Sequence, residues 1–263
     1  MEKQVFKKFS LPLFIFVLLI AGCQESTKDS PYLFREVKSS HSNIHFKNVI
    51  PEDRLTNSFL YEYVYNGGGV AIGDLNNDGL ADIYFTSNLH ENALYMNQRD
   101  LEFEEVANKA GVVGIRGWTT GVSMVDINQD GLLDIYLCKS GPFDKRELLQ
   151  NELYINQGPD KDGIPTFKES AKEYGLDIAV YSIQAAFLDF DLDGDLDMYL
   201  MNHNPQTFAF GSTEEYSPLG DKFLVNEGGK FVDKTTAVGI YSNSISYGLG
   251  VGIGDINQDG WPD

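Results

Sequence analysis

One nine-residue motif occurs four times in this chain, and it constrains the fold more than any other feature. The first copy reads Asp74-Leu75-Asn76-Asn77-Asp78-Gly79-Leu80-Ala81-Asp82, and the others begin at Asp126, Asp189 and Asp255. In each copy, oxygen-bearing side chains occupy positions 1, 3, 5 and 9, and glycine occupies position 6. Glycine at position 6 permits the positive φ angle of a tightly wrapped loop. The motif is therefore typical of a loop that turns several oxygen atoms toward one point.

Such a loop suits a hard cation, because Ca²⁺ takes six to eight oxygen ligands at about 2.3–2.6 Å. Position 7 would add its backbone carbonyl, which explains why its side chain varies. The glutamate that an EF-hand carries at position 12 is replaced by Phe85, Leu137 and Leu200, so the aspartate at position 9 is expected to close the shell. We predict one Ca²⁺ per loop, up to four in this chain. The predicted ligand positions are Asp74, Asn76, Asp78, Leu80, Asp82, Asp126, Asn128, Asp130, Leu132, Asp134, Asp189, Asp191, Asp193, Asp195, Asp197, Asp255, Asn257, Asp259, Trp261 and Asp263.

Two other interpretations of the motif remain open. Asn-Asp-Gly also forms hairpin turns that hold no metal. Mg²⁺ is a second candidate ion, although it prefers a smaller octahedral shell and keeps its waters. Four copies in the same register favour calcium, because a turn needs only one or two of these residues.

The repeat extends beyond the loop into four short apolar segments per unit. In the first unit they are residues 69–73, 83–86, 92–97 and a segment that begins at Phe103, and residues 250–254 are the counterpart of the first segment before the fourth loop. The segments are rich in β-branched and aromatic residues and are separated by Gly, Asn and Asp, which is typical of β-strands. Successive loops begin 52, 63 and 66 residues apart. These spacings predict an all-β fold, a β-propeller of four-stranded antiparallel blades, with a β-solenoid as the alternative.

The two ends of the chain bear on the size of this propeller. Residues 34–37 and 43–46 resemble the fourth strand of a unit, which in a ring can complete the last blade. The chain stops on the ninth residue of its fourth loop, Asp263. We therefore interpret it as an N-terminal fragment with about three to four blades of a ring that would have seven when complete.

Residues 1–22 are predicted to be a lipoprotein signal peptide. They begin with lysines and continue into an apolar run of 12 residues, 11–22, shorter than the ~20 that a spanning helix needs. Residues 19–23, Leu-Ile-Ala-Gly-Cys, resemble the bacterial lipobox; an ordinary signal peptide or a membrane anchor is the alternative. Lipid on Cys23 would anchor the protein without spanning the membrane. Residues 23–31 would form a polar tether and 32–263 the propeller, and the absence of aspartate after Cys23 favours, by analogy, the bacterial outer membrane, periplasmic or surface-exposed.

The formal net charge of −19 narrows the classes of partner. The four loops carry three, three, five and three carboxylates, which repel one another unless a cation lies among them. Calcium is therefore expected to be structural. The same acidity excludes nucleic acid as a partner, because phosphate recognition needs basic surfaces. Cys138 lies inside a predicted strand and is expected to be a buried thiol.

The longest connections, 139–150 and 202–220, are predicted at the end of the blades opposite the acidic loops. Loops on a rigid scaffold often carry function, so we expect a protein or carbohydrate ligand here, with a ligand-free surface insertion as the alternative. The candidate ligand-face residues are His203, Phe208, Phe210 and Tyr216. The four histidines are far apart in sequence and no nucleophile motif accompanies them, so no catalytic residue is assigned.

The motif D-x-[ND]-x-D-G-x-x-D and its flanking strands resemble FG-GAP repeats, also described as VCBS repeats, over about residues 66–263. The resemblance implies an integrin-α-type propeller with metal ligands at the motif positions and no catalytic residue. Residues 65–74, with Asn202-His203-Asn204, resemble a narrower group, Bacteroidetes lipoproteins of the cartilage acidic protein type, which often end in an ASPIC/UnbV domain. The expected function is a calcium-binding, lipid-anchored adhesion or binding module. The alternatives are a polysaccharide lyase or hydrolase with structural calcium, and an accessory protein of an outer-membrane nutrient importer.

Overall fold

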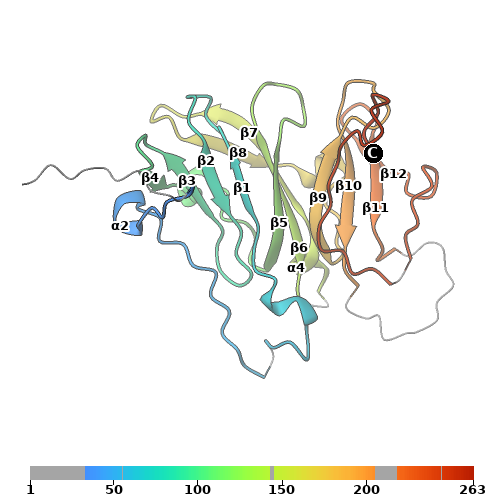
Figure 1. The fold of residues 1–263 in the computed structure, drawn as a ribbon, viewed down its shortest axis with the longest axis horizontal. Helices are drawn as coiled ribbons and strands as arrows, with labels where there is room; N and C mark the ends of the chain where they lie inside the picture. The colour runs from blue at the N-terminus through green and yellow to red at the C-terminus, as the bar shows by residue number, and fades with distance from the viewer. Residues whose placement is uncertain (1–32, 55, 143–144, 205–217, 244) are drawn as a thin grey trace, which may run out of the picture. The chain divides into compact units, whose positions relative to one another are not determined.

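The computed structural model describes residues 33–54, 56–142, 145–204, 218–243 and 245–263. Contacts divide the chain into residues 1–37 and 38–263, and all the strands belong to the second unit. In the described residues these strands form three sheets, each with four antiparallel strands in chain order (Figure 1). The first sheet contains β1 (Val70–Gly73), β2 (Asp82–Phe85), β3 (Ala93–Asn97) and β4 (Phe103–Glu105). The second contains β5 (Trp118–Val125), β6 (Asp134–Ser140), β7 (Glu152–Pro159) and β8 (Pro165–Glu169). The third contains β9 (Ser182–Leu188), β10 (Asp197–Asn202), β11 (Lys222–Asn226) and β12 (Phe231–Asp233).

Single-turn helices occupy several of the connections. They are α2 (Ser39–Ser42), the 3-10 helix η1 (Glu62–Tyr65), α3 (Ala107–Ala110), α4 (Arg146–Leu149) and α5 (Ala171–Tyr174). Helices α3 and α5 follow the fourth strands of the first and second sheets, and each ends at a glycine in the left-handed conformation, Gly111 or Gly175. The chain that follows the fourth strand of these two sheets is therefore a single helical turn.

Each acidic loop closes between two paired residues. Gly73 pairs with Asp82, Val125 with Asp134, and Leu188 with Asp197. The residue before position 1 thus lies opposite position 9 in all three sheets. This shared register makes the loop the turn between the first and second strands of each sheet.

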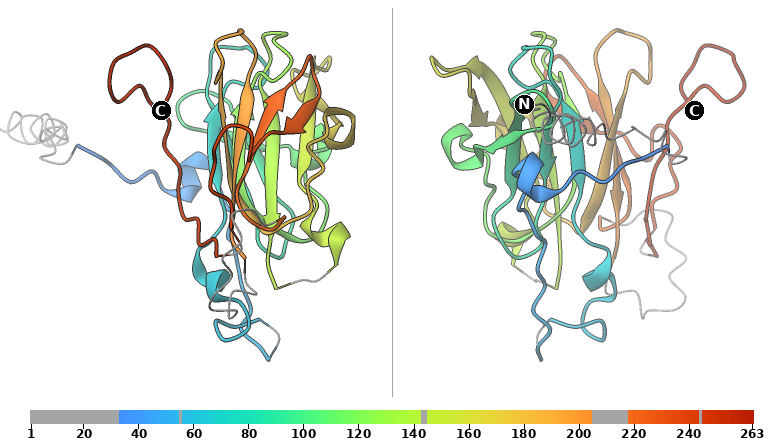
Figure 2. Two further views of the ribbon diagram at one scale, coloured as in Figure 1. Left: turned by 90° about the vertical axis from the view of Figure 1, so that its right-hand side faces the viewer. Right: turned by 60° about the vertical axis from the view of Figure 1, so that its left-hand side comes forward.

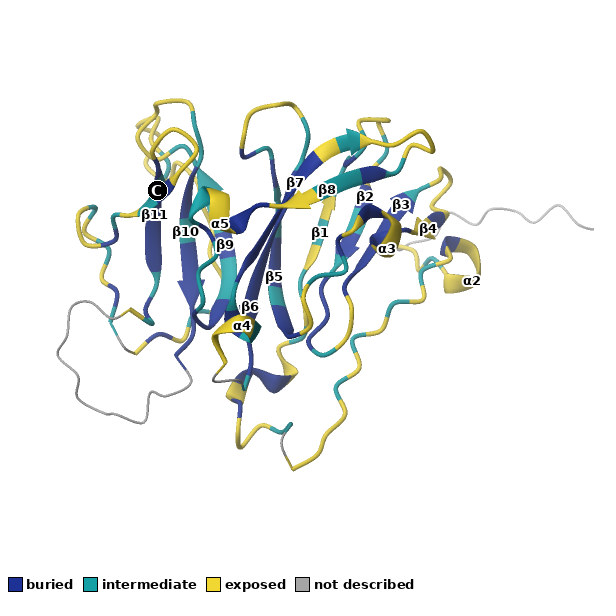
Figure 3. Cartoon of the chain, turned by 180° about the vertical axis from the view of Figure 1, so that it is seen from behind, coloured by how far each residue is buried: buried dark blue, intermediate teal, exposed yellow. Residues whose placement is uncertain are grey.

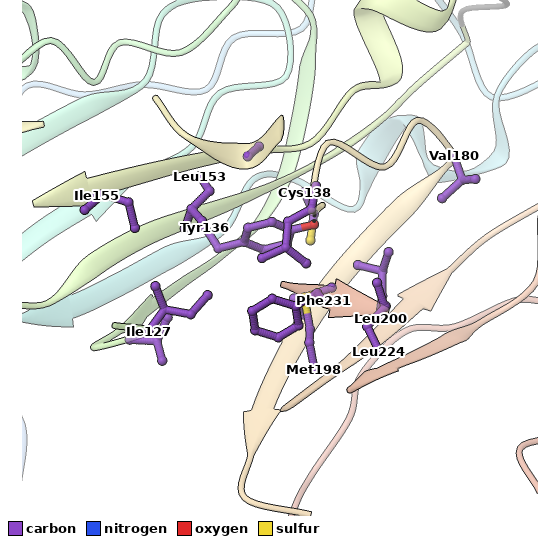
Figure 4. Close-up of a cluster of buried hydrophobic side chains, with 14 residues drawn as sticks. Ile127, Tyr136, Cys138, Leu153, Ile155, Val180, Met198, Leu200, Leu224 and Phe231 are labelled. Atoms are coloured by element: carbon purple, nitrogen blue, oxygen red, sulfur yellow. Dashed lines mark hydrogen bonds between the residues drawn. The ribbon is translucent and has the colours of Figure 1, made fainter. Parts of the chain in front are cut away.

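The sheets pack face to face through two apolar cores. Tyr84 and Leu94 of the first sheet meet Ile135 and Tyr154 of the second in one cluster. A second cluster joins Tyr136 and Cys138 to Met198 and Leu200 of the third sheet (Figure 4). The innermost strands β1, β5 and β9 contact one another in that order. Buried positions follow the strands, whereas the loops at both ends are largely exposed (Figure 3). These features confirm the predicted all-β fold of propeller blades, and Cys138 is buried as expected.

Glycine permits the close approach of the inner strands. The amide of Gly69 donates to the carbonyl of Thr120 at 2.8 Å, so β1 and β5 touch through their backbones. At Gly121, an added Cβ would overlap the carbonyl oxygen of Ile183. The packing of β5 against β9 therefore excludes any side chain at position 121.

Aromatic side chains join the segment before β1 to the second and third sheets. Tyr61 shares a hydrogen bond with the hydroxyl of Ser140 at 2.9 Å. Tyr63 stacks on His203 with ring centroids 3.7 Å apart and planes 16° apart. Burial lowers the pKa of the His203 imidazole from 6.5 to about 4, and the backbone of Ser246 opposes only part of this shift.

Two expected strands are absent from the described residues. Residues 250–254 pair with no neighbouring strand and lie exposed, and this C-terminal segment stands apart from the sheets in Figure 2. A short apolar sequence forms a strand only when another strand completes its hydrogen bonds. Residues 34–37 and 43–46 are likewise not strands. Phe46 instead stacks on Phe85 at 5.0 Å, and Ile44 packs on the same apolar cluster, so burial of these side chains replaces strand pairing.

We expect Gly121→Ala to lower the free energy of unfolding by about 1–3 kcal/mol, because the inner strands must separate to admit the methyl group. Urea titration followed by circular dichroism measures the change. Gly252→Ala is the matched control, since a Cβ there meets no atom within 4 Å. Equal stability of the two variants would contradict the close-packed contact between β5 and β9.

Protonation of His203 should make stability depend on pH. The pKa of His203 is near 6.5 in the unfolded chain and about 4 in the folded chain. Its contribution to the free energy of unfolding is therefore complete above pH 6.5 and is lost as the pH falls toward 4. Tyr61, Tyr63 and Tyr247 pack against its ring, and burial raises the pKa of Tyr61 and Tyr63, so these two phenols stay neutral throughout this range. Between pH 7.5 and pH 5 the free energy of unfolding should fall by about 2 kcal/mol more in the wild type than in His203→Phe. Chemical denaturation at both pH values tests this, and parallel pH profiles would refute it.

Candidate metal centres

The acidic loops lie at one end of the blades, where the first strand of each sheet turns into the second (Figure 1). Three of them connect β1 to β2, β5 to β6 and β9 to β10. The fourth loop, residues 255–263, follows the exposed C-terminal segment. The placement of the first three loops agrees with the end of the blade expected from the strand order.

All four loops share one backbone conformation. Position 4 has a positive φ in each copy, at 58° for Asn77, 59° for Gln129, 58° for Leu192 and 62° for Gln258. The glycine at position 6 has φ values of 84°, 86°, 97° and 90° in the same order. A positive φ is uncommon for residues other than glycine, and least expected for a branched side chain such as leucine. The loops therefore wrap in the same way regardless of the side chain at position 4.

Side-chain oxygens in each loop turn inward onto the loop's own amides. In the second copy, Asp126 accepts hydrogen bonds from the amides of Asp130 at 3.0 Å and Gly131 at 2.9 Å. Asp130 accepts one from the amide of Leu132 at 2.9 Å. The first and fourth copies repeat this pattern. Positions 1 and 5 thus point their oxygens into the concave side of the loop.

The aspartate at position 9 has a different environment. The carboxylate of Asp134 is fully buried and accepts from two amides, Ile127 at 3.1 Å and Asn156 at 2.7 Å. Burial raises its pKa to about 6, although both amides favour the charged form. Asp82 and Asp197 make the corresponding pairs of hydrogen bonds. Position 9 therefore fastens the loop to the second and third strands, a role that the motif alone did not reveal, and its part in the metal shell remains a prediction.

The third loop departs from the shared pattern in a way that suits a cation. Ligand atoms of Asp189, Asp191 and Asp193 lie within 4.8 Å of one another. Asp189 Oδ1 is buried without a hydrogen-bond partner in the described residues, whereas the same atom accepts an amide in the other copies. A buried carboxylate oxygen is costly unless a donor or a cation compensates it. The residues of this loop therefore fit a hard divalent ion.

The opposite end of the blades contains only part of the expected ligand face. His203 is buried in the aromatic cluster and does not present its ring to solvent. Phe208, Phe210, Tyr216 and the expected lipidation site Cys23 lie outside the described residues. A cavity of about 460 Å³ near the connections from β2 to β3 and from β4 to β5 has His90, Glu91 and Arg116 in its wall.

A buried ion pair supports the wall of this cavity. Lys139 Nζ lies 2.6 Å from Glu152 Oε1, and each side chain is 2% exposed. Lys139 donates to the carbonyl of Ile115 at 2.8 Å, and Glu152 accepts from the amide of the same residue at 3.0 Å. Both charges therefore clamp the connection between the first and second sheets. The sequence did not predict this ion pair, because Lys139 and Glu152 are single charged residues that lie far apart along the chain.

Comparison with known proteins agrees with the repeat and its geometry. Residues 59–137 match the family model described as FG-GAP-like repeat. The chain is 25% identical to cartilage acidic protein 1 of Xenopus tropicalis over 174 residues, which cover 65% of this chain and 25% of that protein. It is 29% identical to the Homo sapiens protein of the same name over 141 residues, or 52% of this chain and 20% of that protein.

The chain thus spans about a quarter or less of the length of the curated relatives it matches. In the described residues no helix combines the length and apolar character needed to cross a membrane. The matched segment, 59–137, contains the whole first blade and the first acidic loop, and the same strands and loop recur in the next two sheets. With its repeats folded as antiparallel four-stranded blades, the chain is similar to FG-GAP repeat proteins.

Proposed function

We propose that this chain is a binding module of the propeller type, stabilised by Ca²⁺ in its acidic loops. The observation that carries the proposal is the single backbone conformation of four loops with oxygen ligands at the same positions. A turn without metal needs no such agreement at positions 1, 3 and 5. The buried, unpartnered Asp189 Oδ1 adds support, because a cation would compensate it.

In this proposal Asp, Asn and backbone oxygens of each loop hold the ion, and the ion offsets carboxylate repulsion in a chain of net charge −19. The aspartates at position 9 keep the loop attached to the sheet whether or not the ion is bound. Calcium would then contribute stability by mass action, since it binds the folded loop only.

The proposed ligand face is the end of the blades opposite the loops. Its support is the cavity lined by His90, Glu91 and Arg116 and the length of the connections at this end. Polar and charged groups around a concave surface suit a protein or carbohydrate ligand. FG-GAP repeats as a family favour a binding or adhesion role, and no catalytic group is needed for it.

We further propose that lipid on Cys23 anchors the module at the bacterial outer membrane. The support is the sequence alone, a basic start, a short apolar run and a lipobox-like Leu-Ile-Ala-Gly-Cys. An anchor of this kind would leave the blades on the membrane surface, available to a partner.

Removal of calcium should lower the melting temperature of the chain by at least about 10 °C, because four sites each lose on the order of 2–3 kcal/mol. Differential scanning calorimetry in excess Ca²⁺ and in EDTA measures the change, with Mg²⁺ as the ion control. Two variants separate the roles of the loop residues. Asp126→Asn should reduce the rise in melting temperature that calcium causes and leave the melting temperature in EDTA nearly unchanged. Asp134→Asn should also destabilise the protein in EDTA, lowering its free energy of unfolding by about 2–3 kcal/mol, because it breaks a buried hydrogen bond. Identical melts in calcium and EDTA would overturn the calcium proposal.

Lipidation can be tested separately from calcium. Expression in a bacterium with a fatty-acid label should place label on the wild-type chain, and the protein should fractionate with membranes. Cys23→Ser should remove both properties, while Cys138→Ser, at the buried thiol, should retain them. An unlabelled wild-type chain would rule out the lipid anchor.

A further inference from the structure

The side chain at loop position 4 reaches across to the next blade. Asn77 Nδ2 donates to the carbonyl oxygen of Gly131 at 3.0 Å. Gln129 Nε2 donates to the carbonyl oxygen of Gly194 at 2.6 Å. Both acceptors are the position 6 glycine of the following loop. The same relation therefore joins the first loop to the second and the second to the third.

Each of these bonds fixes the peptide plane that leads to position 7. In the second loop, the carbonyl of Gly131 accepts from Asn77 while the amide of Leu132, in the same plane, donates to Asp130 at 2.9 Å. In the third loop, the carbonyl of Gly194 accepts from Gln129 and the amide of Asp195 donates to Asp193 at 3.0 Å. A peptide plane held from both sides loses less freedom when its loop orders around an ion.

The donor itself belongs to the preceding metal loop. Position 4 lies between the proposed ligands at positions 3 and 5 and has a positive φ in every copy. Fixing positions 3 and 5 on an ion would therefore also fix the donor at position 4. When an ion orders one loop, the next loop has less conformational entropy left to lose when it binds its own ion. This effect makes binding at the two sites positively cooperative.

The series of hydrogen bonds from one loop to the next ends at the third loop, which has no donor at position 4. The third loop carries Leu192 at position 4, and its hydrocarbon side chain cannot donate a hydrogen bond. In the fourth loop, Gln258 makes no side-chain hydrogen bond within the described residues. A second link strengthens the first junction only, since Asn156 Nδ2 donates to Leu75 at 2.8 Å and to Leu133 at 3.1 Å.

We infer that Asn77 and Gln129 are coupling residues that make calcium binding cooperative across the first three loops, and that Leu192 ends this cooperative group. This inference rests on the proposed calcium binding and adds that binding at one loop regulates binding at the next. By reciprocity, an ion in the third loop raises the affinity of the second as much as the second raises that of the third.

Hydrogen exchange measured by mass spectrometry at increasing free Ca²⁺ can follow each loop separately. In the wild type, peptides covering residues 126–134 and 189–197 should become protected at a common midpoint and in a steep transition. Gln129→Leu should raise the midpoint of the third loop about five- to tenfold and flatten the transition. The backbone tolerates this change, because Leu192 takes the same φ at the equivalent position.

Gln258→Leu is the matched control and should leave both midpoints unchanged. A double-mutant cycle isolates the coupling, because Asp126→Asn should raise the midpoint of the third loop in the wild type and have no effect on that loop in Gln129→Leu. Asn77→Leu provides the same test at the first junction should Gln129→Leu not fold. If calcium protects the third loop from exchange with the same midpoint in the wild type and in Gln129→Leu, the proposed coupling is wrong and the calcium proposal stands. Absence of calcium-dependent protection in the wild type overturns both.

Discussion

A buried carboxylate at the ninth loop position fastens together three backbone segments in each of the three sheets. Asp82 receives the amides of Leu75 in the loop and Asn97 at the end of the third strand, while its own backbone begins the second strand. Removing a carboxylate from water is costly, and the two amides compensate much of that cost. The raised pKa of about 6 reflects the burial that remains. Because this contact recurs at Asp134 and Asp197, the first three loops sit on their sheets in the same orientation.

Contacts between blades change in chemistry from one end to the other. At the loop end, amide side chains such as Asn77, Gln129 and Asn156 bridge neighbouring sheets. Along the inner strands, Gly69 and Gly121 let backbones touch. At the far end, the stacked rings of Tyr63 and His203 join distant parts of the chain. Polar bridges orient the loops, and apolar packing supplies most of the burial. The proposed metal sites and the proposed ligand face are therefore separated by the length of a rigid blade.

Sequence patterns anticipated the repeated elements well because each repeat satisfies its own local requirements. Short segments rich in β-branched and aromatic residues predicted the strands of three sheets, and the glycine at position 6 predicted the wrapped loop. The prediction was wrong for residues 250–254 and for 34–37 with 43–46, where strand formation depends on a partner and local pattern cannot supply one. Phe46 illustrates the alternative outcome, since stacking on Phe85 buries it without any strand.

The sequence by itself determined the all-β repeat, the position of the acidic loops within each unit and the placing of oxygen-bearing side chains within each loop, because these follow from residue spacing over a few residues. Only the tertiary structure decided what residues far apart in the chain do for one another. It paired Lys139 with Glu152, buried His203 against Tyr63, and directed Gln129 to Gly194. These contacts depend on how sheets stack, and the physical reason is that a hydrogen bond or ion pair between blades requires distances that only the packed fold sets.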